Sequence, residues 1–411
     1  MHKKLVAQII ISMLVMILLG YVTWRHESNI ASKDEVVEDT NTDKIREEKK
    51  DDQKYKIKYV DMSQKETNEA KDSVFTVLKQ CKHLYHEIDK GQASNVTLTE
   101  KAVHQMINLV ASKGYSVTCG AEDYNMQHYK KVNQSLIKAR NHKDSDITFY
   151  VINSSGIFLY QHLQFQDQKL FVTSASASFD ENMEMQLNYV EKLQVYQWNY
   201  TKKGWLIWEK ALSRNQEMDM HVCYRVLPLD DQCREITQTC IAPIGYFCNN
   251  LFLENWDAKS VEKINFNDLF EFLYYIDKGK QLDENKYTEG IPKKDFEEMI
   301  QKYFDISKEK LQKYAHYDRD SETYPWIAID ACNRTPMFQP LPEVVKCEKN
   351  KDGTITAYVE NVFMEEGEDC SFRHQVTLRK EQKNWVYVGN KIEKKYANDI
   401  PSYRARSEYQ Q

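Results

Sequence analysis

The spacing of apolar residues predicts one structural unit that occurs twice in this chain. Apolar side chains recur at helical spacing over residues 74–88 and again over residues 269–276. Gly91 follows the first segment and Gly279 follows the second, and glycine is the residue that most often ends a helix. Asn267 is placed to cap the second helix. The sequence therefore predicts two similar amphipathic helices.

A further helix and then a series of strands follow each of these helices. LTEKAVHQMI, residues 98–107, aligns without a gap with IPKKDFEEMI, residues 291–300. Alternating apolar residues then predict strands in both copies, which close with KKGWLIWEK (202–210) and KNWVYVGNK (383–391). We expect an α+β fold of two tandem units, each with helices packed on an antiparallel sheet. A sheet curved around helices, as in nuclear-transport-factor-like or cystatin-like cones, fits this order.

An apolar run at the N-terminus, Leu5–Trp24, contains no charged residue. At about 1.5 Å per residue, this run spans a hydrocarbon core of roughly 30 Å. A small-residue cleavage site does not follow it directly, so we expect an uncleaved transmembrane helix in the lipid bilayer. Lys3 and Lys4 precede the run and an acid-rich segment follows it. The positive-inside rule then places the N-terminus in the cytoplasm and residues 25–411 outside the cell membrane.

The expected domain boundaries follow from shifts in composition. Residues 27–65 are highly charged and poor in large apolar side chains, which predicts a disordered stalk. We expect a cytoplasmic tip and anchor at 1–26, a first α+β domain at 66–222, a cysteine-containing connector at 223–262, a second α+β domain at 263–396 and a flexible tail at 397–411.

Net charge and cysteine spacing narrow the choice of partners. The chain has a net charge of −6 and no basic block in its main part, so we do not expect it to bind nucleic acid. Nine cysteines are present, and Cys223, Cys233, Cys240 and Cys248 cluster without the CxxC spacing of a zinc site. Outside the cytoplasm these four residues allow two disulfides, in any of three connectivities.

The pair His83 and His86 is the most metal-like feature of the sequence. A helical wheel places both histidines away from the apolar stripe, whereas the neighbouring Cys81 lies on that stripe. The second unit has Phe272 and Tyr275 at the matching positions. Since a metal site needs three or four convergent ligands, we predict exposed histidines and no metal or cofactor site.

The stretch KYAHYDRDSETYPW, residues 313–326, is dense in polar and aromatic residues. Its acid–base options are His316, Asp318, Asp320 and Glu322, and His374 is a further option on a predicted strand. Recognisable hydrolase, metalloprotease or phosphate-binding motifs do not occur in the chain, so we predict no catalytic residue.

Aromatic and histidine side chains are the candidates for a ligand pocket. Cone-shaped α+β domains have an apolar cavity at the mouth of the cone, and such cavities bind ligands. The candidate pocket or rim residues are Trp198, Trp205, His316, Trp326, His374, Trp385 and Tyr387.

The second half of the chain resembles a known family. The runs CYRVLPLDDQCREI, IAPIGYFCNNLFLENW, NDLFEFLY, EGIPKKDFEEMIQKYF and NKDGTITAYVENVF are similar to those of an uncharacterised family of clostridial cell-envelope proteins. The resemblance covers roughly Cys223 to the C-terminus, and it extends to the first unit only loosely. It implies a cell-envelope location with an N-terminal membrane anchor or lipoprotein signal, and it implies no catalytic residue.

These observations favour a single-pass, extracytoplasmic protein that binds a ligand or acts as a scaffold for envelope proteins. One alternative is a cone-fold scaffold component of a conjugation or secretion apparatus, which the sequence resembles in layout. The other is a small-molecule enzyme that uses a cone cavity. The enzyme alternative predicts a buried carboxylate or histidine that faces such a cavity, and cavities filled by phenylalanine and tryptophan would argue against it.

Overall fold

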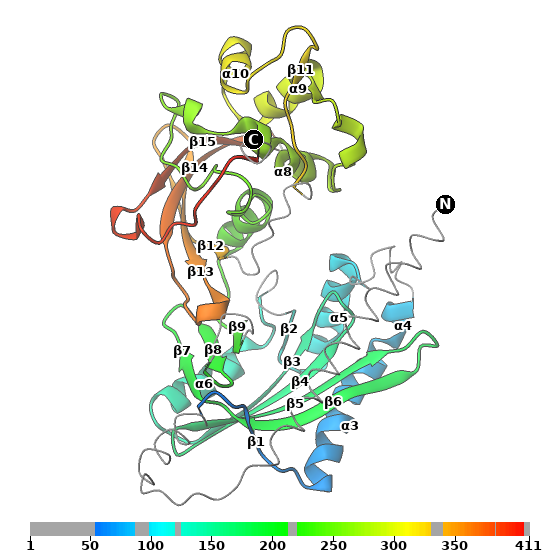
Figure 1. The fold of residues 1–411 in the computed structure, drawn as a ribbon. Helices are drawn as coiled ribbons and strands as arrows, with labels where there is room; N and C mark the ends of the chain where they lie inside the picture. The colour runs from blue at the N-terminus through cyan, green and yellow to red at the C-terminus, as the bar shows by residue number, and fades with distance from the viewer. Residues whose placement is uncertain are drawn as a thin grey trace, which may run out of the picture. The chain divides into compact units, whose positions relative to one another are not determined.

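The computed structural model describes residues 54–86, 98–119, 125–212, 220–329, 340–382 and 384–406 (Figure 1). The predicted transmembrane helix, Leu5–Trp24, and most of the predicted stalk lie outside these residues, as does Gly91. Within the described part of the chain, no helix has both the length and the apolar character needed to cross a membrane. The predicted α+β class is confirmed, since the described structure contains both helices and several sheets.

The first α+β region is built on a six-stranded sheet with the strand order β1-β6-β5-β4-β3-β2. Strands β3 to β6 form an antiparallel meander, and β2 pairs in parallel with β3. A separate three-stranded sheet, β7-β8-β9, follows along the chain. The elements of this region are β1 (Lys58–Tyr59), α3 (Gln64–Gln80), α4 (Lys82–His86), α5 (Glu100–Ser112), β2 (Val117–Thr118), α6 (Tyr129–Arg140), β3 (Ser145–Ile152), β4 (Phe158–Gln166), β5 (Lys169–Phe179), β6 (Met185–Gln194), β7 (Gln197–Tyr200), β8 (Trp205–Glu209) and β9 (His221–Arg225).

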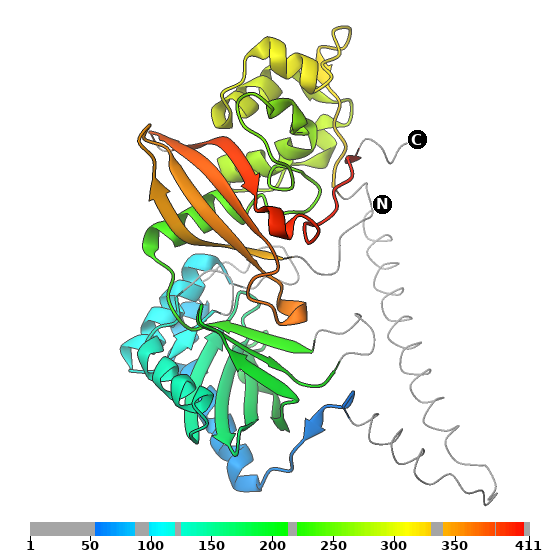
Figure 2. The same ribbon diagram turned by 90° about the vertical axis from the view of Figure 1, so that its left-hand side faces the viewer.

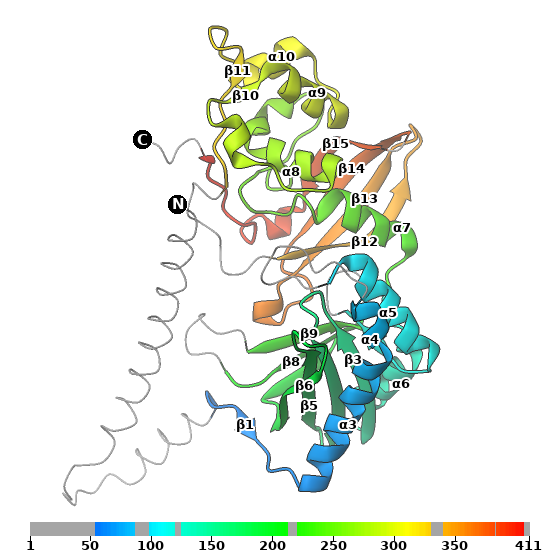
Figure 3. The same ribbon diagram turned by 90° about the vertical axis from the view of Figure 1, so that its right-hand side faces the viewer.

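Both faces of the six-stranded sheet are covered. Helices α3 and α5 pack on one face (Figure 3). On this face Leu78 and Cys81 share a buried core with Ile152. Helix α6 and the three-stranded sheet cover the other face, where Leu136 shares a core with Phe149. Strand β3 supplies both cores because successive side chains of a strand point to opposite faces. Cys81 is fully buried, as the helical pattern predicted.

The second region contains a four-stranded antiparallel meander, β12-β13-β14-β15, together with its own helices (Figure 2). Helix α7 packs on β12, α9 packs on β15, and α8 packs on α9. A two-stranded ribbon pairs β10 with β11. The elements are α7 (Asp231–Ile236), a π-helical turn (Thr237–Ile241), α8 (Phe266–Lys278), β10 (Ile291–Pro292), α9 (Lys293–Tyr303), α10 (Lys308–Tyr314), β11 (Thr323–Tyr324), β12 (Leu341–Lys349), β13 (Ile355–Val362), β14 (Arg373–Glu381) and β15 (Asn384–Ile392).

The ends of α8 show which residues begin and stop this helix. Asn265, not the predicted Asn267, caps the N-terminus, and its side chain accepts a hydrogen bond from the backbone N–H of Asp268. Gly279 ends the helix with a φ of 64°, the left-handed conformation that glycine adopts without steric cost, so this part of the prediction is confirmed. The side chain of Asn267 is thereby left for contacts outside the helix.

The domain boundaries differ from those expected from composition. Strand β1 pairs with β6, so residues within the expected stalk at 27–65 belong to the sheet. Residues 223–262 are not a separate connector, because Cys233 and Ile236 are buried in the core of the second region. The expected flexible tail at 397–411 includes Arg406, which is fully buried. Each difference arises from contacts that are distant in sequence.

The two regions share a meander but are not copies of one another. Strands β3 to β6 and strands β12 to β15 have the same antiparallel connections. The segments 202–210 and 383–391, which are similar in sequence, have different places in the fold. The first forms β8 of the three-stranded sheet, and the second forms β15, the last strand of the second meander.

The cysteines do not form the disulfides that their spacing allowed. Among the described residues, the thiols of Cys81, Cys233, Cys240, Cys347 and Cys370 are free. Cys223 packs beside Val362, whereas Cys240 lies in the core of the second region. Cys233 instead lies beside Cys347, which is 114 residues away in sequence.

Glu343 connects the two α+β regions through buried charges. Its side chain accepts a hydrogen bond from the indole N–H of Trp205 at 3.4 Å. Lys203 Nζ lies 3.2 Å from one of its oxygen atoms, and Arg225 Nε lies 2.9 Å from the other. Lys203 also pairs with Glu360 at 3.0 Å. Since an uncompensated buried charge is costly, these partners must stay together in the folded state.

Glu343→Ala is expected to lower the free energy of unfolding by about 3 kcal/mol, because it removes a carboxylate partner from the buried Arg225 and from the half-buried Lys203. Glu348→Ala is the matched control, since Glu348 lies on the same strand and pairs with Lys346 at the surface. The control is expected to cost about 1 kcal/mol or less. Denaturant unfolding of the purified protein measures both values, and equal losses in the two variants would contradict the buried network.

Candidate functional site

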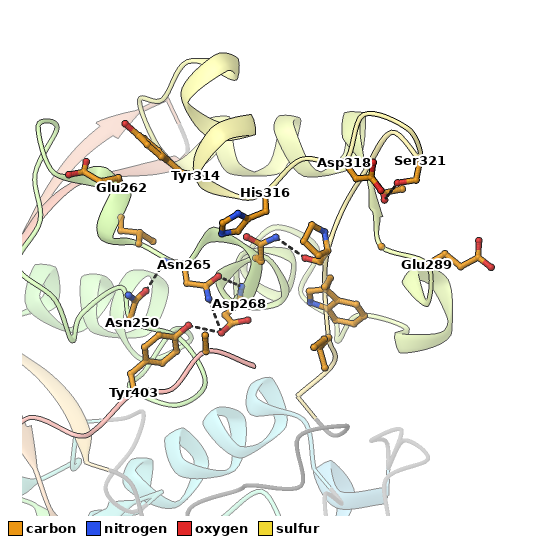
Figure 4. Close-up of a pocket in the computed structure, with 18 of the residues that line it drawn as sticks. Asn250, Glu262, Asn265, Asp268, Glu289, Tyr314, His316, Asp318, Ser321 and Tyr403 are labelled. Carbon is orange, nitrogen blue, oxygen red and sulfur yellow. Dashed lines mark hydrogen bonds between the residues drawn. The ribbon is translucent and has the colours of Figure 1, made fainter. Parts of the chain in front are cut away.

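A groove of about 990 Å³ lies in the second region (Figure 4). Its position follows from the helix capping described above, because the N-terminus of α8 forms part of its lining. Figure 4 shows Glu262 and Tyr314 towards one end of the groove and Glu289, Asp318 and Ser321 towards the other. The lining comes from residues 250, 262–265, 267–268, 288–290, 314, 316, 318, 321, 323, 325–327, 403 and 405.

Asp268 organises the polar side of the groove. Its carboxylate accepts hydrogen bonds from the Tyr403 hydroxyl at 2.6 Å, from the Arg406 backbone N–H at 3.0 Å and from Arg406 Nε at 3.1 Å. Arg406 also donates to Glu271 through Nη1 at 2.8 Å. Burial and the neighbouring Asp268 carboxylate raise the pKa of Tyr403, so its hydroxyl remains a donor at neutral pH. These bonds hold the C-terminal segment against α8.

Asn267 holds the opposite wall in place. Its side-chain amide donates to the carbonyl of Ala315 at 3.0 Å and to the carbonyl of Pro325 at 2.7 Å. Because these acceptors neighbour His316 and Trp326 in sequence, the two bonds bring both side chains to the lining of one groove. Gly290 completes the wall with a φ of 95°, and a Cβ atom there would lie 2.8 Å from the carbonyl oxygen of Tyr324.

Trp326 is the unusual residue of this wall. Its indole ring is half-buried and makes an edge contact with Tyr287, with ring centroids 6.3 Å apart. Its Nε1 atom is buried, and no described residue accepts a hydrogen bond from it. Leaving a buried donor unpaired costs free energy, so the few that occur in native structures often mark functional positions.

The ends of the groove carry a negative charge. Glu262, Glu289 and Asp318 are exposed there, whereas Lys263 is the lining residue of opposite sign. The backbone N–H of Asp320 donates to Asp318 at 2.8 Å and lowers the pKa of that carboxyl, which is therefore ionised at neutral pH. The groove thus offers aromatic surfaces between acidic ends.

The polar side chains of the groove are engaged mainly with other residues of the chain. In the described part of the chain, no group of three or more His, Cys, Asp or Glu side chains is arranged to hold a metal ion. Ser321 shares a hydrogen bond with the Thr323 hydroxyl at 2.8 Å, which is not the contact with a general base that activates a serine. Asp268, the buried carboxylate, is fully engaged by Arg406 and Tyr403.

The structure brings two of the seven candidate pocket residues together and separates the rest. His316 and Trp326 line the groove. Trp385, Tyr387 and His374 are buried on strands of the second meander, where period-two alternation points them into the core instead of a cavity. Two candidates lie elsewhere, Trp205 at the junction beside Glu343 and Trp198 against Phe165 in the first region.

Several residues of the groove were not among the sequence candidates. Asn265 and Asp268 belong to the turn that caps α8. Two asparagines lie close together there, Asn265 and Asn267, and the sequence does not show which of them caps the helix. Tyr403 and Arg406 lie in the segment that was expected to be a flexible tail. An aromatic and a basic side chain within an otherwise polar segment were the only indication that this segment packs. The sequence does not show that they contact Asp268.

His374 has a structural environment despite its acid–base chemistry. Its Nδ1 lies 2.7 Å from Asn390 Oδ1, and its Nε2 lies 2.8 Å from the Tyr246 hydroxyl. The Asn390 amide group donates to the carbonyls of Phe252 and Glu254, so its oxygen accepts from His374 Nδ1. Tyr246 then donates to Nε2. Burial lowers the pKa of His374 to about 4, which keeps the imidazole neutral.

The chain belongs to a family of unknown function (DUF6070), whose model matches residues 66–406. Membership of an uncharacterised family is therefore confirmed, and the match extends beyond the motifs of the second half to include the first region. It ends at Arg406, the residue that pairs with Asp268 beside the groove. No curated protein and no solved structure matches the chain significantly.

Arg406→Ala is expected to lower the free energy of unfolding by about 3 kcal/mol or more, because it leaves the buried Asp268 carboxylate without its cation. Arg404→Ala is the control, since Arg404 lies two residues away and is exposed. Denaturant unfolding measures both changes. If the two variants lost the same small amount of stability, the C-terminal segment would not be held as the structure describes.

The pKa of His374 predicts a loss of stability in acid. Between about pH 6.5 and pH 4, the imidazole takes up a proton in the unfolded chain but not in the folded one. The free energy of unfolding is therefore expected to fall by about 1.4 kcal/mol per pH unit from this residue as the pH decreases through that range. In His374→Gln this contribution disappears, and urea titrations from pH 4 to pH 8 compare the slopes. Parallel pH profiles for the two proteins would be inconsistent with a neutral, buried His374.

Proposed function

We propose that this protein is a binding module whose groove takes an extended segment of a partner polypeptide that carries a basic side chain. The observation that carries the proposal is the groove wall at Trp326, where a half-buried aromatic ring lines a groove with acidic ends. Tyr314 and His316 extend that wall with further planar side chains. By binding such segments, the protein would act as a scaffold for envelope proteins.

The physical features of the groove favour a peptide over a smaller ligand. At about 990 Å³, it is at the upper end of the volumes of small-molecule pockets and runs between several separate segments. The half-buried ring of Trp326 offers an aromatic surface against which a bound segment would pack. A lysine or arginine side chain would be attracted by Glu262, Glu289 and Asp318, and its cation would also favour the face of an aromatic ring.

We also propose that the groove lies outside the cell membrane. The uncharged run Leu5–Trp24 and the lysines before it support a single membrane span with the N-terminus in the cytoplasm. The motifs that resemble cell-envelope proteins support the same location. As part of this proposal we retain cone-like curvature of the two sheets, which the shared four-stranded meanders support.

The enzyme alternative has less support than binding. It requires a cone cavity with an available buried acid or base. The sheet face that would line such a cavity in the second region is packed with Phe252, Trp256, Phe304 and Tyr387, and both nitrogen atoms of the buried His374 are engaged. A role in a conjugation or secretion apparatus is a special case of partner binding. The identity of the captured partner would show whether the protein has this role.

The test is photo-crosslinking from the groove in the full-length protein in its native cells. A benzophenone amino acid replaces Tyr314, which lines the groove and has a similar shape. The expected result is a reproducible adduct with one partner, in which the crosslinked peptide, mapped by mass spectrometry, contains a lysine or arginine. The matched control places the same group at Tyr275, which is 47% exposed and does not line the groove, and is expected to give no such adduct.

Two further variants make the result specific to Trp326. Trp326→Phe keeps an aromatic ring and removes the unpaired donor, and Trp326→Ala removes both. Capture is expected to fall modestly in the first and at least about tenfold in the second, as for a tryptophan at the centre of an interface. An adduct that forms equally from Tyr275, or that survives Trp326→Ala unchanged, would count against the groove as the binding site.

A further inference from the structure

Two cysteines that are distant in sequence meet between α7 and β12. Cys233 lies on α7 and Cys347 on β12, and their Sγ atoms are 3.6 Å apart. Cys233 is buried at 3% exposure, whereas Cys347 is half-buried. The sequence analysis did not predict this pair, because Cys347 lies outside the cysteine cluster of residues 223–248.

The backbone around both cysteines is fixed by other interactions. Asp230 caps α7 and accepts hydrogen bonds from the N–H groups of Gln232 and Cys233. Thr237 then joins the helix to the strand, since its hydroxyl donates to the carbonyl of Cys233 at 2.9 Å and accepts from the N–H of Val344 at 2.9 Å. The two sulfur atoms are thus held in contact by secondary structure on both sides.

A β-bulge determines which way Cys347 faces. Val344 pairs with Val359, but Lys346 pairs with Tyr358, so one extra residue lies in β12 between them. Cys347 then pairs with Ala357, whose side chain lies in the same core as those of Val344 and Val359. Without the extra residue Cys347 would share the face of Glu343. The bulge therefore turns the thiol towards α7.

We propose that Cys233 and Cys347 form an intramolecular disulfide when the protein meets an external disulfide, either a low-molecular-weight one or that of a thiol oxidoreductase. Cys347, the more exposed residue, loses its proton and attacks the external disulfide RSSR, which forms a mixed disulfide and releases RS⁻. The Cys233 thiolate then attacks Cys347 Sγ and releases the second RS⁻. The two cysteines lose two electrons and two protons, and RSSR is reduced to two RSH.

The contact between the two sulfur atoms shifts the pKa values of the reduced thiols in opposite directions. The hydrogen bond between the two sulfur atoms lowers the pKa of Cys233, and the same contact together with burial raises the pKa of Cys347. In the reduced pair Cys233 is therefore the thiol that ionises first, and Cys347 becomes the attacking thiolate by passing its proton to Cys233 across the 3.6 Å contact. Cys240 differs, since burial raises its pKa to about 12.

The proposed disulfide would enclose the groove-bearing part of the fold. The covalent loop from Cys233 to Cys347 contains the groove residues from Asn250 to Ile327, while Tyr403 and Ala405 lie outside it. Closing a loop of this length restricts the unfolded chain strongly and stabilises the folded state. Oxidation in cells rests on the proposed location outside the membrane, whereas oxidation of the purified protein does not.

The test follows the Cys233–Cys347 crosslink in the full-length protein. Cells are quenched with acid, free thiols are blocked with N-ethylmaleimide, and the linked peptide is quantified by mass spectrometry with and without reduction. The same measurement is made on detergent-purified protein treated with oxidised glutathione. The linked peptide is expected in both samples and absent from Cys233→Ser and Cys347→Ser, while Cys240→Ala is expected to retain it.

Thermal unfolding gives a second readout that needs no variant. The oxidised wild-type protein is expected to unfold at a temperature higher by roughly 5 °C or more than the protein reduced with a phosphine. Absence of the linked peptide from oxidised, purified wild-type protein would overturn the proposal. A linked peptide that forms after purification but not in cells would support the pair and would instead contradict the proposed extracytoplasmic location.

Discussion

The groove depends on one buried ion pair, Asp268 with Arg406. Both side chains are almost fully buried, so each charge requires the other, and removing either leaves a charge that the interior cannot solvate. Asp268 lies in the first turn of α8, where the helix dipole also favours a negative charge. The same carboxylate accepts from Tyr403 and from the side-chain amide of Asn265. One residue thus ties the start of a helix to the end of the chain, and the groove lies between them.

The sequence predicted the elements whose formation depends on local pattern. Helices α3, α5, α8 and α9 could be predicted because each has one buried face. A buried face requires apolar residues at helical spacing, whatever surface it packs against. The sheets of both regions were readable from alternation. What was not readable depends on distant partners. Composition cannot show that β1 would pair with β6, that Cys233 would be buried in the second core, or that Arg406 would find Asp268.

The candidate site shows that residues of the same type cannot be assigned different roles from the sequence alone. Trp326 and Trp385 have the same side chain, but Trp326 lines an open groove and Trp385 is buried on β15. The difference is set by which face of its element each ring occupies and by what covers that face. Asn265 and Asn267 give a second example. Either residue suits a helix cap, and only the bonds that Asn267 makes to the carbonyls of Ala315 and Pro325 show that it holds the groove wall instead.

Strand β12 combines the two connections that fix the second region. Before its bulge, Glu343 faces the first region and meets Lys203 and Arg225. After the bulge, Cys347 faces α7 and meets Cys233. A regular strand would place residues 343 and 347 on the same face, so it would satisfy one connection and lose the other. A single extra residue therefore lets one edge strand serve an ionic junction on one side and a thiol pair on the other, which explains why this strand contains an irregularity.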